Sequence, residues 1–343
     1  MSDAPKLEHY CGVFGCVMRP PSPTAAQNGH CETTTALPHA ASVASILSIG
    51  SVDGGGGRCC EGRGGDAVSD ELLRVTIDGL LALQHRGTES SGVVASTLAA
   101  EDNFRIHKGK GMVRDVYSDF GCLREKFAGC RMSIGHNRYS TAGMKDAINA
   151  VQPFVVYTLA GLVAVAHNGQ LVDAFGKRKL RQEFLNEGHV LSTDTDSELV
   201  AALIGRKAAE RLGGGERVDS DVLEELKSVL HTLELSYSML VMTPGHLYAV
   251  RDRYGNRPLA LGLLQGGAEG CVVASESVAF SLVNARYVRD VAPGEVVELG
   301  ADGRSFQTRY RSPSVARQSF CIFEYIYFAN STTIMERRSE GDR

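Results

Sequence analysis

The sequence predicts an α+β fold in which sheets pack against each other and helices cover the outside. Helical and strand-like segments come in blocks along the chain, not in the strict alternation of a doubly wound parallel sheet. Residues 131–139 and 154–157 alternate like half-buried strands, and residues 161–166 are apolar throughout, like a fully buried one. A chain of 343 residues that is 43% hydrophobic can bury a core in one large or two modest domains.

The N-terminal part of the chain contains a short strand and a long segment without a structural pattern. We interpret residues 1–10 as a pro-segment and the glycine-containing apolar run from Cys11 as a buried strand. Residues 19–68 are rich in Pro, Ser, Thr and Gly, so we predict a disordered insertion there. A helix capped at Ser69 or Asp70 should follow.

The remaining elements follow from the spacing of apolar residues and from turn signals. Strands are expected at 92–96, 104–107, 131–139, 154–157, 161–166, 236–242, 246–251, 259–262, 271–274 and 288–299. Helices are expected at 113–127, at 173–187, after a cap at Thr193 or Asp194, and at 218–233.

Composition excludes several classes of function. A formal net charge of −4 gives no electrostatic basis for binding nucleic acid or an anionic membrane. No apolar run approaches the ~18 residues of a membrane span, and residues 1–10 do not form a secretory signal. Nine scattered cysteines without such a signal indicate reduced thiols and a cytoplasmic location. Without a C-x-x-C pair, no structural metal site is predicted.

Cys11 has two interpretations. Loss of residues 1–10 would place a thiol and an α-amino group on one residue, and an amine titrating near ~8 can take the thiol proton at neutral pH. Alternatively, Cys11 is a small core residue of an edge strand.

Three polar clusters at the ends of strands or helices offer complementary chemistry. Arg138 and Thr141 could hold a carboxylate, or Arg138 could form a surface ion pair. Asn168 and Gly169 could form an oxyanion hole, or an Asn-Gly turn. Asp196 could accept from an ammonium group, or belong to a helix cap. With Cys11, these groups describe a site that binds an α-amino acid and attacks its side-chain carbonyl.

Arg86 lies in a fourth cluster, Gln84-His85-Arg86-Gly87, at a helix end. There it could simply complement the helix dipole.

In this order, the stretches CGVFGC, LQHRGTESSG, GHNRYSTAG, AHNGQL and TDSE resemble the N-terminal-nucleophile glutamine amidotransferases, and among them the amidophosphoribosyltransferase family. The later stretches YAVRDRYGNRPLALG, VVASES and CIFEYIYFA fit the same family. The resemblance implies a four-layer αββα sandwich for residues 11–310, a type-2 glutamine amidotransferase domain. It implies that residues 319–343 begin a truncated α/β phosphoribosyltransferase domain.

The resemblance also implies a role for each candidate residue. Cys11, as the mature N-terminus, attacks the glutamine amide, and Asn168 and Gly169 stabilise the oxyanion. The residues implied to bind glutamine are Arg86, Arg138, Tyr139, Thr141 and Asp196. The full-length enzyme that the resemblance implies acts in purine (IMP) synthesis, is a homo-oligomer and uses Mg²⁺. In it, ammonia would react with phosphoribosyl pyrophosphate to give 5-phosphoribosylamine.

The sequence departs from the family pattern near its end. No acidic phosphate loop of the VDDSIVRGT type occurs, so this chain is expected to retain only the glutaminase half and to need no cofactor of its own. Val278 stands where iron–sulfur members have a cysteine, which argues against a [4Fe-4S] cluster. Phe320, Ile322, Phe323 and Tyr325 should lack a full partner surface. The alternatives are a non-catalytic isoform or regulatory subunit and a hexosamine-forming transaminase.

Overall fold

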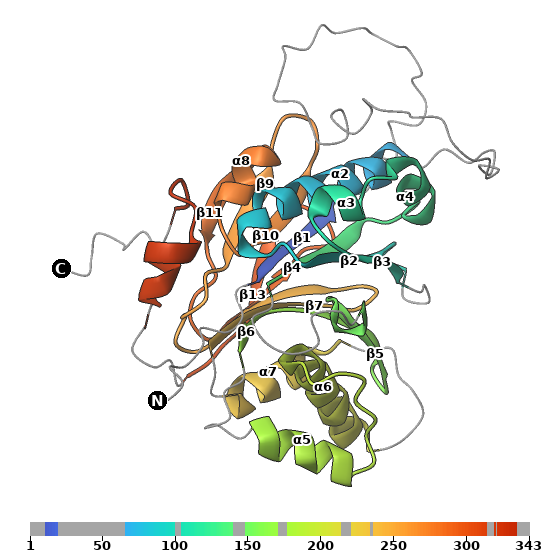
Figure 1. The fold of residues 1–343 in the computed structure, drawn as a ribbon, viewed down its shortest axis with the longest axis vertical. Coiled ribbons are helices and arrows are strands. Elements are labelled where there is room, and N and C mark those ends of the chain that lie inside the picture. Colours follow the sequence, from blue (N-terminus) through green and yellow to red (C-terminus); the bar gives the residue numbers. More distant parts are fainter. Residues whose placement is uncertain are drawn as a thin grey trace, which may run out of the picture.

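The structure, a computed structural model, describes residues 11–19, 66–99, 104–139, 148–170, 177–213, 221–233, 236–313, 319 and 321–334. The expected pro-segment, most of the expected insertion and Thr141 lie outside these ranges. The described residues form two antiparallel sheets packed face to face, with helices on both outer faces (Figure 1). The four-layer αββα architecture is therefore confirmed.

The first sheet has seven strands in the order β11-β9-β10-β1-β4-β2-β3, and the second has six in the order β13-β12-β8-β7-β6-β5. The strands of the first sheet are β1 (Gly12–Met18), β2 (Ser90–Ser96), β3 (Arg105–Lys110), β4 (Met132–Arg138), β9 (Ala260–Leu264), β10 (Gly270–Ala274) and β11 (Ala285–Asp290). Those of the second are β5 (Phe154–Thr158), β6 (Gly161–Gln170), β7 (Ser236–Met242), β8 (Leu247–Arg251), β12 (Glu295–Leu299) and β13 (Phe306–Arg311).

The helices divide between the two outer faces (Figure 1). The first sheet is covered by α2 (Ala67–Ala82), α3 (Val113–Val116), α4 (Phe120–Lys126) and α8 (Val278–Leu282). The second is covered by α5 (Lys177–Asn186), α6 (Asp196–Leu212) and α7 (Leu223–Thr232). Two short 3₁₀ helices, η1 (Gln84–Arg86) and η2 (Ile148–Ala150), and a π-helical segment, η4 (Glu324–Phe328), complete the described elements.

Strand β1 is apolar on both faces because it packs between two apolar layers. Val13 and Val17 belong to the layer between the sheets, whereas Phe14, Cys16 and Met18 belong to the layer beneath α2. This alternation follows from the two-residue period of a strand. Cys16 is fully buried, as expected for a core residue. Because β1 lies between β10 and β4, the interpretation of this stretch as an edge strand was wrong.

Several predicted helix boundaries were wrong, and in α2, α4 and α6 a side-chain cap decides where the helix begins. Helix α2 begins at Ala67, and its cap is Asp66, whose carboxylate accepts from the Ser69 backbone N–H at 2.9 Å. The expected helix over 113–127 is two helices, because Asp119 caps the second one. Helix α6 is capped by Thr195 and not by the two preceding residues, and α7 begins at Leu223.

Most predicted strands fall within the two sheets, but the strand expected over 288–299 is divided between β11 in the first sheet and β12 in the second. Two further features differ from expectation. Strand β6 continues through residue 170 because its last residues pair with β7, ending at Gln170 opposite Ser236. The sequence pattern also gave no indication of β13 or α8. In the described part of the chain, no helix combines the length and the apolar character that crossing a membrane requires.

Candidate active site

Cys11 lies at the start of β1, at the point where the two sheets meet. Its backbone nitrogen is 3.4 Å from Oδ1 of Asn168, which lies on β6 of the opposite sheet. Only 4% of Cys11 is exposed, yet the residue lines a pocket of about 100 Å³. A cavity of this size holds more than one water-sized group.

The pocket brings together four of the predicted site residues. Its lining consists of Cys11, Arg138, Ala150, Gln152, His167, Gly169, Lys177, Asp194, Thr195, Asp196 and Ser197. Cys11, Arg138, Gly169 and Asp196 are among them, although they come from β1, β4, β6 and α6. Tyr139, which is 39% exposed, and the fully buried Asn168 and Arg86 do not line it.

The thiol of Cys11 experiences opposing influences. Burial raises its pKa, because a thiolate loses hydration in the interior. The backbone N–H of Tyr139 and the positive charges of Arg138, Arg257 and Arg86 act in the opposite direction. The site therefore surrounds a buried thiol with groups that favour its anionic, nucleophilic form.

Asn168 and Gly169 lie within strand β6 and not in a turn, so the turn interpretation was wrong. The side-chain Nδ2 of Asn168 is 3.5 Å from Oγ of Ser275, at the limit of a hydrogen bond, and is held only weakly. A Cβ atom on Gly169 would lie 2.6 Å from the Ser236 carbonyl oxygen and 2.8 Å from Nε2 of His167. Only glycine fits at this wall of the pocket.

The N-terminal end of α6 also lines the pocket. Thr195 caps this helix by accepting from the Glu198 backbone N–H, so Asp196 is not the capping residue. Asp196 is 6% exposed and lines the pocket, and its carboxylate pairs with Nζ of Lys177 at 2.5 Å. The carboxylate expected to accept an ammonium group thus already contacts one.

Two further pocket residues, Gln152 and His167, were not among the predicted site residues. Oε1 of Gln152 accepts from the His167 backbone N–H at 2.7 Å, and Nδ1 of His167 is 3.2 Å from Oγ of Ser197. The second contact connects β6 to the start of α6, and the first connects β6 to the residues before β5. His167 precedes Asn168 in the AHNGQL stretch, which was the available signal, whereas nothing in the sequence indicated Gln152.

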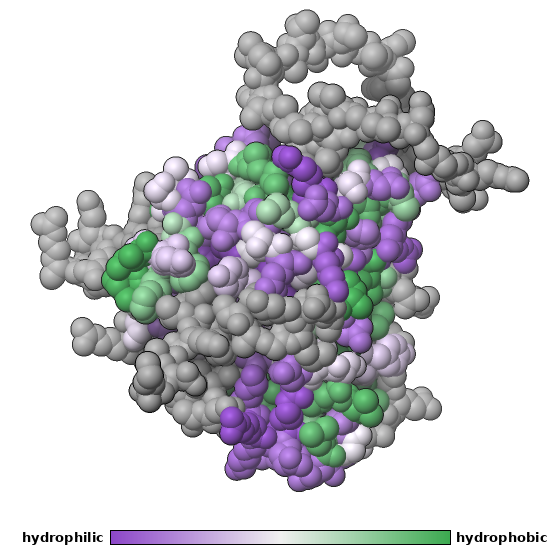
Figure 2. Space-filling view, in the orientation of Figure 1, coloured by the Kyte–Doolittle hydropathy of each residue, from purple (hydrophilic) through white to green (hydrophobic). Residues whose placement is uncertain are grey.

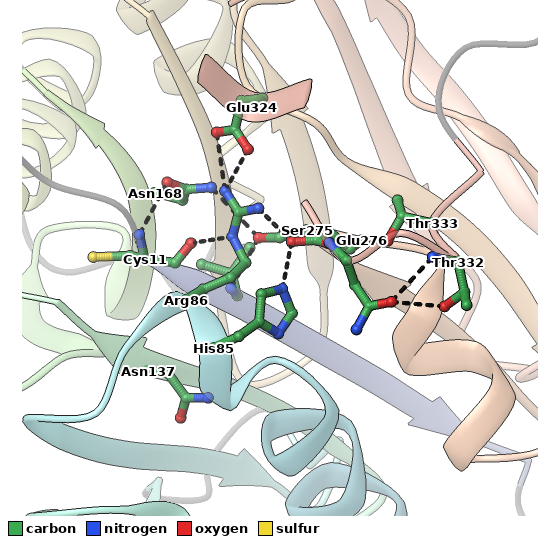
Figure 3. A network of polar contacts seen from close by, with 12 residues as sticks. Cys11, His85, Arg86, Asn137, Asn168, Ser275, Glu276, Glu324, Thr332 and Thr333 are labelled. Carbon is green, nitrogen blue, oxygen red and sulfur yellow. Dashed lines mark hydrogen bonds and ion pairs between the residues drawn. The ribbon is translucent and has the colours of Figure 1, made fainter. Parts of the chain in front are cut away.

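Arg86 lies behind Cys11 in a buried polar network (Figure 3). Its Nε donates to the Cys11 carbonyl oxygen at 3.0 Å, and its other nitrogens pair with Glu276 and Glu324. Arg86 does not line the pocket, so the geometry gives no support for direct glutamine binding. A Cβ at Gly87 would lie 2.6 Å from the Arg138 carbonyl carbon, which explains the glycine after Arg86.

The described residues offer no evident metal site. Within the described ranges, no group of three or more His, Cys, Asp or Glu side chains is placed to hold a metal ion. Val278 packs against the apolar layer beneath α2, and its aliphatic side chain supplies no ligand for iron. The Mg²⁺ of the full-length enzyme remains a prediction.

Comparison with known proteins agrees with this geometry. Residues 136–281 match the family model described as a glutamine amidotransferase domain. The chain is 40% identical to amidophosphoribosyltransferase of Drosophila melanogaster over 279 residues, which is 78% of this chain and 49% of the relative. It is 40% identical to that of Mus musculus over 272 residues, 75% of this chain and 50% of the relative.

A solved structure of glutamine phosphoribosylpyrophosphate amidotransferase from B. subtilis, complexed with ADP and GMP, gives a TM-score of 0.66 at 29% identity. The match covers 94% of this chain and 54% of the B. subtilis chain. The fold and pocket therefore define a glutamine amidotransferase. More particularly, the chain is similar to amidophosphoribosyltransferases over about three quarters of its length, and it spans about half the length of the curated relatives it matches.

Proposed function

We propose that this chain is the glutamine-hydrolysing half of an amidophosphoribosyltransferase, with Cys11 as the nucleophile. The observation that carries the proposal is the pocket itself. A thiol, an arginine and a carboxylate from three separate elements line one cavity, and the Cys11 backbone nitrogen lies at the side chain of Asn168. This arrangement matches the two ends of glutamine, a side-chain amide and an α-amino acid group.

In the proposed reaction, the Cys11 α-amine takes the thiol proton and the thiolate attacks the side-chain carbonyl carbon of glutamine. The resulting oxyanion receives hydrogen bonds from Nδ2 of Asn168 and the backbone N–H of Gly169. The α-ammonium returns the proton to the leaving nitrogen, the C–N bond breaks, and ammonia and a glutamyl thioester form. Water then attacks the thioester, the C–S bond breaks, and glutamate and the free thiol are released.

The α-amino acid end of glutamine would lie toward α6. Arg138 is placed to pair with the α-carboxylate, and Asp196 to accept from the α-ammonium. We assign Tyr139 and Thr141 to the same carboxylate side. The charged pair at one end and the thiol at the other would fix glutamine with its amide carbon beside Cys11.

The product ammonia would be consumed by the remaining half of the enzyme. There, ammonia would displace pyrophosphate from phosphoribosyl pyrophosphate and give 5-phosphoribosylamine. This part of the proposal rests on the relatives, whose names include the phosphoribosyl transfer and which are about twice as long as the matched region.

Measurement of glutamate release tests the proposed function. Cys11→Ala and Cys11→Ser should both abolish it, because neither alanine nor an unactivated hydroxyl replaces a thiolate. Cys122→Ser, which changes an exposed cysteine on α4, is the matched control and should leave the activity unchanged. Full activity in Cys11→Ala would overturn the assignment.

The role of the α-amine has a separate test, because an acylated nitrogen is not basic. Intact-mass analysis of active protein should show that residues 1–10 have been removed, leaving Cys11 first. An active sample that retains Met1 would refute the α-amine as the base while leaving the thiol as the nucleophile. Assays with and without phosphoribosyl pyrophosphate would show whether the second substrate affects this half-reaction.

A further inference from the structure

We propose that Glu324 is a positioning residue that holds the nucleophile in place through Arg86. The proposal rests on Cys11 being the nucleophile and extends the site to a segment, residues 321–334, that follows the second sheet in sequence. Figure 3 shows Glu324 above Arg86 and Cys11 beside it, with the three residues joined in series by dashed contacts.

The contacts form a continuous connection of short bonds. The Glu324 carboxylate is fully buried, and both of its oxygens accept from Nη2 of Arg86 at 2.9 Å. Nε of the same guanidinium donates to the Cys11 carbonyl oxygen at 3.0 Å. Because a guanidinium is planar and rigid, fixing one edge of it with a carboxylate fixes the direction of the N–H that holds Cys11.

Polar contacts attach the segment carrying Glu324 to the sandwich. The Glu276 carboxylate accepts from the Asn330 backbone N–H at 2.9 Å and from the Thr333 hydroxyl at 2.7 Å. In contrast, apolar side chains of η4 face outward, with Ile326 75% and Tyr327 78% exposed, and Figure 2 shows hydrophobic surface where Figure 1 draws this segment. Ile322, Phe323 and Tyr325 are also exposed, at 59%, 43% and 51%, as the sequence predicted, whereas Phe320 lies outside the described residues. The segment is therefore held at the Arg86 network and not by a large apolar contact of its own.

Glu324 also balances charge around the thiol. Arg86, Arg138 and Arg257 are the positive groups that act on Cys11, and Nη1 of Arg257 is 3.0 Å from Glu324. Glu324 is thus a counter-ion of two of these three arginines. The other titratable groups in the network are Glu276, which pairs with Arg86, and His85, which contacts Glu276 at 2.9 Å.

Neutralising Glu324 should have two separable effects on Cys11. The guanidinium of Arg86 loses one of its two carboxylate partners, so the Cys11 backbone is held less firmly. The positive charges of Arg86 and Arg257 lose a counter-charge, which favours the thiolate. The first effect lowers the rate of the chemical step, and the second moves titration of the thiol to lower pH.

The test uses Glu324→Gln, with Glu269→Gln as the matched control, because Glu269 also pairs with two arginines, Arg19 and Arg304, but at the surface. For Glu324→Gln, kcat for glutamine hydrolysis should fall at least ~10-fold with KM changed less than ~2-fold, the pattern of lost positioning. The pH midpoint of Cys11 alkylation by iodoacetamide should fall by at least ~0.5 units. Glu269→Gln should change neither.

A second variant protects the test against a general loss of folding. Adding Arg257→Gln to Glu324→Gln restores the charge balance and should return the alkylation midpoint toward that of the unaltered chain. An unaltered midpoint and kcat in Glu324→Gln, or a midpoint that the second substitution does not reverse, would overturn the proposal. Alkylation of Cys11 needs no glutamine, so it tests the role of Glu324 even in a chain without glutaminase activity. Absence of glutaminase activity in the unaltered chain would refute the proposed function, and the alkylation midpoints would still decide the role of Glu324.

Discussion

Replacing Asn168 with alanine separates a catalytic role for this side chain from a structural one. The Asn168 amide is fully buried between the sheets, with Oδ1 3.4 Å from the Cys11 nitrogen and Nδ2 3.5 Å from Oγ of Ser275. Asn137 provides a matched control, because it is also fully buried but makes shorter contacts, 2.6 Å to the Leu80 carbonyl oxygen and 2.9 Å to Oγ of Ser91.

The magnitudes predict opposite rankings for the two variants. The long hydrogen bonds of Asn168 lie at the weak end of a net contribution of about 0.5–1.5 kcal/mol each, so Asn168→Ala should lower the free energy of unfolding by about 1 kcal/mol. Loss of one oxyanion donor should lower kcat by about 10²–10³-fold, or 2.7–4 kcal/mol. Asn137→Ala should cost more stability, because it leaves a buried carbonyl and a hydroxyl without their partner, and less kcat.

The assay pairs glutamate release under saturating glutamine with urea unfolding of both variants. The reasoning predicts that Asn168→Ala loses more kcat and less stability than Asn137→Ala. It would be refuted by a kcat for Asn168→Ala within about 10-fold of the unaltered chain, a loss too small for an oxyanion donor. It would also be contradicted if one of the two variants lost more of both kcat and unfolding free energy than the other.

Two further predictions follow from ion pairs of the site. Lys177→Met should lower KM for glutamine several-fold without changing kcat, because the Lys177 ammonium pairs with the Asp196 carboxylate that the substrate must reach. Lys179→Met, which changes an 82% exposed side chain of the same helix, is the control. A raised KM in Lys177→Met would contradict the prediction. Burial alone would raise the pKa of Glu276, but His85 and Arg86 lower it to about 2. The contacts of the Glu276 carboxylate with these two residues therefore stabilise the fold above the unfolded pKa of 4.5, and this contribution disappears as pH falls toward 2. The difference in unfolding free energy between the unaltered chain and Glu276→Gln, measured by urea titration, should therefore shrink between pH 5 and pH 2, and a constant difference would contradict it.

The family resemblance predicted the four-layer sandwich, and local patterns predicted most of its strands. The apolar runs of β1 and β6 reflect burial on both faces, and such runs can be recognised from residues close in sequence. Helix starts were less predictable, because several candidate caps stood near each other. The carboxylate of Asp66 caps α2 and also pairs with Arg131, which is distant in sequence.

Four pocket residues, Cys11, Arg138, Gly169 and Asp196, were among the predicted site residues, but Gln152 and the supporting network of Arg86 were not predictable. Arg138 and Asp196 carry charges at the ends of elements, where loops present functional groups. In the sequence, Arg86 stands at the end of an element, as these two residues do. Tertiary packing, however, brings Glu276 and Glu324 to it from positions about 190 and 240 residues away. No local pattern contains that information, so a glutamine-binding role was expected where the structure shows a contact to the Cys11 carbonyl oxygen.

The most direct test of the central claim is to trap the covalent intermediate. Protein mixed with glutamine and quenched in acid should carry one glutamyl group as a thioester, and peptide mapping should place it on Cys11. Cys11→Ala should carry none. Glutamate release without any adduct, or an adduct on another cysteine such as Cys122, would contradict the account.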